Sequence, residues 1–116
     1  MAFYRASIGG GGGGGELSQV IKYVTGNNST AATATITSNT DPNLYAVLWT
    51  NSSNAQYRDD NSRINSVSGA SYTLIDDYEE GTSRVRLYKL TNCQSTVSVV
   101  PNSTTSNAAK NVLLLK

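Results

Sequence analysis

After its first 16 residues, this chain is a succession of short β-type segments in which no stretch keeps a helical hydrophobic period beyond two turns. Residues 31–38 show the β pattern best, because Ala and Ile alternate strictly with Thr. Turn signals rich in Gly, Pro, Asn and Asp recur about every 8–12 residues. This spacing predicts an all-β fold, a single antiparallel β-sandwich of about seven or eight short strands.

Two segments are apolar on both faces. They are Leu44 to Thr50 and Val112 to Leu115. A strand with one solvated face alternates between apolar and polar residues, whereas a strand covered on both faces does not. We therefore expect both segments to be central, buried strands.

Ser83 to Thr91 alternates in a different way. Its pattern predicts that Arg84 and Arg86 face solvent while the intervening Val85 and Leu87 face the core. The phase of the alternation changes near Tyr88, which indicates a β-bulge in this strand.

The N-terminal segment differs from the rest of the chain. Seven consecutive glycines offer no side chain to bury and lose much entropy when they are ordered. They divide the chain into an arm, residues 1–15, and a β-domain, residues 16–116. We expect the arm to dock on a neighbouring subunit, where glycine permits close backbone approach. The alternative is that the glycines form a plain flexible spacer. Its side-chain anchors and its glycine spacer are Phe3, Tyr4, Arg5, Ile8, Gly9, Gly10, Gly11, Gly12, Gly13, Gly14 and Gly15.

Charge and composition argue against several classes of partner. The net charge is +1 and there is no basic stripe, so no nucleic-acid partner is expected. No stretch approaches the roughly 20 apolar residues of a membrane helix. The N-terminus also lacks the apolar core of a secretory signal, so we expect a chain that is neither exported nor inserted in a membrane.

The side chains that carry most catalysis are scarce. There is no histidine, and Cys93 is the only cysteine, so we expect neither an enzyme nor a cofactor. The carboxylates of residues 76–80 could bind calcium, but their spacing matches no EF-hand loop. We favour a solvated hairpin turn that faces Arg84 and Arg86. Its acidic residues are Asp76, Asp77, Glu79 and Glu80.

A polar stretch at residues 51–62 reads as a long loop, and long loops often contact partners. Its possible ligand-binding residues are Tyr57, Arg58, Asp59 and Asp60. Aromatic residues could also form a platform on which a sugar stacks, although aromatics on strands are usually core residues or cross-strand pairs. The platform candidates are Tyr23, Tyr45, Trp49, Tyr57 and Tyr72.

The head MAFYRASI, the glycine run, and a β-domain in which Ser, Thr and Asn make up about a third of the chain together resemble small virion proteins of tailed bacteriophages. That group includes auxiliary capsid and tail-associated proteins. The resemblance implies assembly in the host cytoplasm onto a particle, with copies of the chain itself and other virion proteins as partners. It transfers no functional residue.

The expected function is therefore structural: capsid decoration, head-fibre anchoring or a tail-associated role in a phage virion. Two alternatives stay open. One is a surface module that binds a glycan through Tyr57 and its loop. The other is a subunit of an extracellular filament whose arm pairs as a strand with the next subunit.

Overall fold

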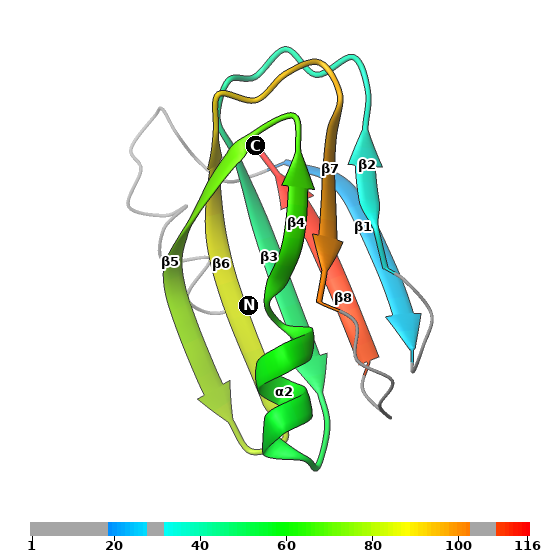
Figure 1. Cartoon of the computed structure of the whole chain (residues 1–116), viewed down its shortest axis with the longest axis vertical. Coiled ribbons are helices and arrows are strands. Elements are labelled where there is room, and N and C mark those ends of the chain that lie inside the picture. The colour runs from blue at the N-terminus through cyan, green and yellow to red at the C-terminus, as the bar shows by residue number, and fades with distance from the viewer. Residues whose placement is uncertain (1–18, 28–31, 103–108) are drawn as a thin grey trace.

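The computed structural model describes residues 19–27, 32–102 and 109–116. These residues form eight strands and one short helix, coloured along the chain in Figure 1. In chain order the elements are β1 (Val20–Asn27), β2 (Ala34–Ile36), β3 (Leu44–Asn51), α2 (Ala55–Asn61), β4 (Ile64–Ser68), β5 (Ser71–Glu80), β6 (Ser83–Thr91), β7 (Val97–Pro101) and β8 (Ala109–Leu115).

The strands form two antiparallel sheets, which confirms the predicted β-sandwich. The larger sheet has the order β1-β8-β3-β6-β5, and the smaller has the order β2-β7-β4. In Figure 1 the smaller sheet and α2 lie on the same side of the larger sheet. The larger sheet therefore has an inner face toward β2, β7 and β4, and an outer face that points away from them.

The main core lies between the two sheets. Strict alternation in residues 32–37 places Ala32 and Ala34 inside and the neighbouring threonines outside, as the pattern predicts. The small side chains of Ala32, before β2, and Ala34, on β2, let the smaller sheet approach the bulkier residues of the inner face. The core consists of Ala32, Ala34, Leu44, Ala46, Leu48, Tyr88, Leu90, Val97, Val99, Val112 and Leu114.

The prediction that residues 44–50 and 112–115 form central strands is confirmed. β3 pairs with β6 on one side and with β8 on the other, and β8 lies between β3 and β1. Their two apolar faces serve two different layers. Leu48 and Val112 belong to the core between the sheets, whereas Val47 and Leu115 belong to a second apolar cluster on the outer face.

The predicted orientation of β6 is wrong. Arg86 lies on the inner face with only 2% of its surface exposed, while Leu87 belongs to the cluster on the outer face. The alternation itself is real, but both faces of this sheet carry apolar residues, so period two cannot tell which face is inside. The predicted bulge in β6 is also wrong, because the irregularity lies on its neighbour, between Leu74 and Asp76 of β5.

Candidate functional site

The predicted ligand loop is a helix. Residues 55–61 form α2, which begins after the N-cap Asn54, whose Oδ1 accepts hydrogen bonds from the backbone N–H groups of Gln56 (2.9 Å) and Tyr57 (3.3 Å). Asn is a favoured N-cap residue, so Asn54 before Ala55 was the available signal for this helix. Tyr57 is half-buried on α2 and is not a loop tip.

Arg58 and Asp59 of that candidate site are engaged within the chain, whereas Asp60 lies half-buried on α2. Arg58 Nε contacts Glu79 Oε2 at 2.7 Å, and Arg58 Nη1 donates to the Ser52 carbonyl at 2.8 Å. Asp59 Oδ1 accepts hydrogen bonds from Arg86 Nη2 at 2.6 Å and from Arg63 Nη2 at 3.0 Å. Both side chains therefore hold α2 to the larger sheet.

Together these charges form an ion-pair cluster between α2 and the inner face of β5 and β6. Its members are Arg58, Asp59, Arg63, Asp77, Glu79, Arg84 and Arg86. At its centre, the buried Arg86 guanidinium donates to the Asp59 carbonyl at 2.7 Å and to Ser62 Oγ at 2.5 Å, besides its ion pair with Asp59. A buried guanidinium needs such partners, because an unpaired buried charge is strongly unfavourable.

The acidic hairpin splits between the two faces of the larger sheet. Asp77 and Glu79 lie opposite Arg86 and Arg84, whereas Asp76 and Glu80 point to the other face. Arg84 binds Asp77 through two hydrogen bonds, of 3.0 and 2.8 Å. Asp77 therefore faces the arginines, as predicted. The predicted turn at residues 76–80 is wrong, because these residues belong to β5 and pair with β6 as far as Ser83.

The carboxylate oxygens of this cluster are already occupied by arginine donors, so few of them are available to a metal ion. Within residues 19–27, 32–102 and 109–116, no group of three or more Asp, Glu or Cys side chains is placed to hold a metal ion. A carboxylate that binds an arginine with both oxygens offers few lone pairs to a cation.

The arginines also set the acid response of the protein. The hydrogen bond from Arg86 lowers the pKa of Asp59, and the hydrogen bonds from Arg84 lower the pKa of Asp77. Because both pKa values are lower in the folded chain than the usual 3.8, the ionised carboxylates stabilise the fold above that pH. This stabilisation disappears as the pH falls through the lower, folded-state values.

We therefore expect the melting temperature to fall steeply as the pH drops below the usual carboxyl pKa of 3.8. An Asp77→Asn variant should have a lower melting temperature at neutral pH. Its melting temperature should fall less on acidification, because one of the two carboxylates with a lowered pKa is gone. Asp60→Asn is the matched control, since no ion pair to Asp60 is present among the described residues. Thermal melts of the three proteins across the acid range measure the effect. Parallel curves for Asp77→Asn and the wild type would contradict it.

The outer face of the larger sheet is the second candidate site. Cross-strand register places one apolar row over β1, β8, β3 and β6, and the adjacent row adds aromatic rings. We define the outer face by its nine large side chains: Tyr23, Tyr45, Val47, Trp49, Tyr78, Val85, Leu87, Leu113 and Leu115. At its two edges, Tyr23 is 52% exposed and Tyr78 is 55% exposed.

The aromatic side chains here are held in place. The Tyr23 and Trp49 rings stack, with centroids 5.7 Å apart and planes 8° from parallel. Asn111 lies beneath them and uses both ends of its amide, since Oδ1 accepts from Tyr23 Oη and from Thr25 Oγ1, and Nδ2 donates to the Trp49 carbonyl. The arrangement is a rigid apolar surface whose central polar group is already satisfied.

The five residues proposed for a sugar platform do not meet. Tyr23, Tyr45 and Trp49 share the outer face. Tyr72 pairs with Leu90 on the inner side of β5. Its ring and that of Tyr88 form a T-shaped pair with their centroids 5.9 Å apart. Sequence reasoning also missed Tyr78 as a member of the outer face, although its place in an alternating strand was a usable signal.

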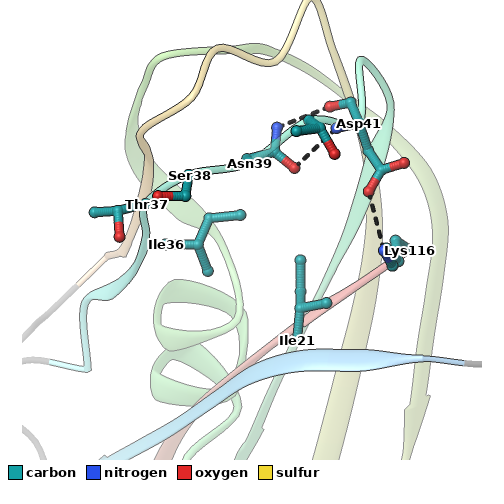
Figure 2. A pocket seen from close by; sticks show the side chains of 8 residues that line it. Ile21, Ile36, Thr37, Ser38, Asn39, Asp41 and Lys116 are labelled. Atoms are coloured by element: carbon teal, nitrogen blue, oxygen red, sulfur yellow. Dashed lines mark hydrogen bonds and ion pairs between the residues drawn. The ribbon is translucent and has the colours of Figure 1, made fainter.

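A shallow pocket lies at one end of the sandwich, between β1, the end of β2 and the turn that follows it (Figure 2). Ile21 and Ile36 form its apolar side, and its volume is about 190 Å³. Its charged groups bind each other, because Lys116 Nζ lies 3.4 Å from Asp41 Oδ2. Asn39 Nδ2 donates a hydrogen bond to the Asp41 carbonyl at 2.8 Å, so the polar residues of the pocket stabilise the turn that follows β2.

Two further reactive groups are Lys110, which is buried, and Cys93, which is half-buried. Lys110 is fully buried, its Nζ has no hydrogen-bond partner in the described structure, and burial lowers its pKa. The sequence around Lys110 does not predict that this lysine is buried. Burial raises the pKa of Cys93, so this thiol stays protonated near neutral pH, and a protonated thiol is a poor nucleophile.

The predicted assembly arm, from Phe3 to Gly15, lies outside the described residues. No helix in the described part of the chain is long and apolar enough to cross a lipid bilayer. Comparisons with protein-family models, with curated proteins and with solved structures found no match to this chain.

Proposed function

We propose that this chain is a structural component of a bacteriophage virion, which docks in the particle through its N-terminal arm and its outer face. The observation that carries this proposal is the second apolar layer. A sandwich needs one apolar face per sheet, yet the larger sheet has two. The centre of this layer is buried at Val47, Leu87 and Leu115, whereas Tyr23 and Tyr78 at its edges are more than half exposed. Exposed apolar side chains of this kind are suited to protein–protein contact.

The energetics favour a docking role for this face. Complete burial of a large apolar side chain stabilises by about 1.5–3 kcal/mol. Tyr23 and Tyr78 are each more than half exposed at the edges of the face, so covering them would contribute a few kcal/mol. The strands already hold these side chains in place, so little conformational entropy is lost on docking.

The described residues favour protein contact over glycan binding. A sugar site needs exposed aromatic faces beside unsatisfied polar groups. Asn111, the polar group at the centre of the aromatic stack, is already hydrogen-bonded on both sides. The helix at residues 55–61 also removes the exposed loop on which the glycan alternative rested. Glycan binding therefore takes second place.

Deletion of residues 1–15 tests the proposal. We expect the truncated chain to keep its β-sheet circular dichroism, because the eight strands that the structure describes all lie beyond the deletion. We expect it to be absent from purified particles when its gene replaces the full-length gene in the genome that encodes it. Quantitative mass spectrometry of the particles measures incorporation.

The full-length chain in the same genome is the positive control. Thr35→Lys, an exposed change on the smaller sheet, controls for a non-specific effect of altering the surface. Normal incorporation of the truncated chain would refute docking through the arm. Absence of the full-length chain from the particles would refute a virion function altogether.

A further inference from the structure

The edge strand β5 is exposed along its whole length. Among the described residues it pairs only with β6, and all ten of its residues are solvent-exposed. At about 3.4 Å per residue, one side of this strand presents roughly 34 Å of unpaired backbone donors and acceptors. The opposite edge of the same sheet, β1, has eight residues, and the edges of the smaller sheet, β2 and β4, have three and five.

Apolar side chains concentrate on this edge. Six large hydrophobic side chains are exposed in the described residues, and four of them belong to β5. Tyr72, Leu74, Ile75 and Tyr78 have exposed fractions of 44%, 45%, 49% and 55%. Edge strands are normally protected by short length or by charged residues, and the first half of β5 has neither.

We propose that β5 pairs antiparallel with β5 of a second copy of this chain, which joins the two larger sheets across a twofold axis. Such an interface is isologous, so each half of the strand must complement the other half. The charge pattern meets this condition, because all four carboxylates lie in residues 76–80 and none lies in residues 71–75.

The axis that best separates the charges lies between Ile75 and Asp76. Antiparallel pairing about that point sets Asp77 opposite Leu74 of the partner copy, and Glu79 opposite Tyr72 of the partner copy. Asp76 and Glu80 likewise meet uncharged residues. A parallel, in-register pairing would instead stack like charges, which is destabilising.

Two features of the edge favour a second copy over an unrelated strand. Asp77 and Glu79 are already neutralised by Arg84 and Arg58 of their own chain, which reduces the repulsion that usually guards an acidic edge. The bulge at Ile75 interrupts the regular strand at its centre. In a second copy, β5 has the same bulge at its centre, so the two bulges meet at the twofold axis. The regular half of β5 on one side of the axis then pairs with the complementary half of the partner copy.

Sedimentation equilibrium of the isolated full-length chain tests this proposal, which does not depend on the virion role. We expect a monomer–dimer equilibrium. Leu74→Asp sets a new carboxylate opposite Asp77 of the partner copy, twice per dimer, and should raise the dimer dissociation constant at least about tenfold. Leu74→Lys, at the same position, faces that carboxylate with the opposite charge and should preserve the dimer.

Tyr23→Asp on the opposite edge strand, β1, is the control for a dimer formed elsewhere. Thermal melts check that each variant folds, which we expect because the substituted side chains are about half exposed. A wild-type chain that stays monomeric at high concentration would overturn the proposal. So would a dimer that survives Leu74→Asp or is lost in Tyr23→Asp.

Discussion

Replacing Gly69 by alanine should destabilise the fold by about 3 kcal/mol or more. Gly69 joins β4 to β5 with φ of +79°, a left-handed conformation that costs other residues roughly 1–2 kcal/mol. An added Cβ would also collide with the backbone carbonyl oxygen of Thr96. That backbone cannot easily move, because the neighbouring Gln94 N–H donates to the Gly69 carbonyl at 2.8 Å and β7 begins at Val97.

Gly81→Ala is the matched control. Gly81 has φ of +60°, but no atom lies within 4 Å of an added Cβ. It should therefore cost only the conformational penalty, about 1 kcal/mol. Urea unfolding of the three proteins measures the difference. Equal losses for the two variants would show that the contact with Thr96 is relieved by small backbone shifts.

The second large effect concerns the buried charge of Arg86. Asp59→Asn should destabilise by about 3 kcal/mol, because it removes the main countercharge and leaves the guanidinium inside the protein. Only Asp77 would remain as an ionic partner, with 3.5 Å between Arg86 Nε and Asp77 Oδ2. The free energy of unfolding at neutral pH measures the loss, and Asp60→Asn, on the same helix, is the control.

The reverse substitution should cost less. Arg86→Met removes the buried charge itself, and the Asp59 side chain, 33% exposed, keeps Arg63 and water as partners. We therefore expect Arg86→Met to be less destabilising than Asp59→Asn. The opposite order would mean that the packing and hydrogen bonds of Arg86 outweigh its need for a countercharge.

Much of the fold could be read from local pattern. Strict alternation in residues 32–37 predicted one buried and one exposed face, and Ala34 and Thr35 lie as expected. Apolar residues on both faces identified β3 and β8 as central strands. These predictions succeed because the side-chain period of a strand is fixed by its backbone and does not depend on its neighbours.

The helix α2 was not predicted, since it is too short and too polar to show a hydrophobic stripe. A helix of seven residues has little stability of its own and depends on tertiary contacts. Those contacts come from distant residues, because Glu79 on β5 binds Arg58, and Arg86 on β6 binds Asp59. Reading residues 51–62 as a loop missed charges that only the folded chain brings together.

Local pattern therefore established which residues alternate and which strands are covered on both faces, because these properties depend on the local backbone. It placed a loop at residues 51–62 and a turn at residues 76–80, where the chain forms α2 and the end of β5. It did not determine which face of β6 is inside, since Arg86 and Leu87 are equally compatible with period two. The packing of the folded chain sets this orientation, because α2 places Asp59 over Arg86 while Leu87 joins the apolar cluster on the outer face. A buried charge is stable only where its partners converge, and that convergence is a property of the whole fold.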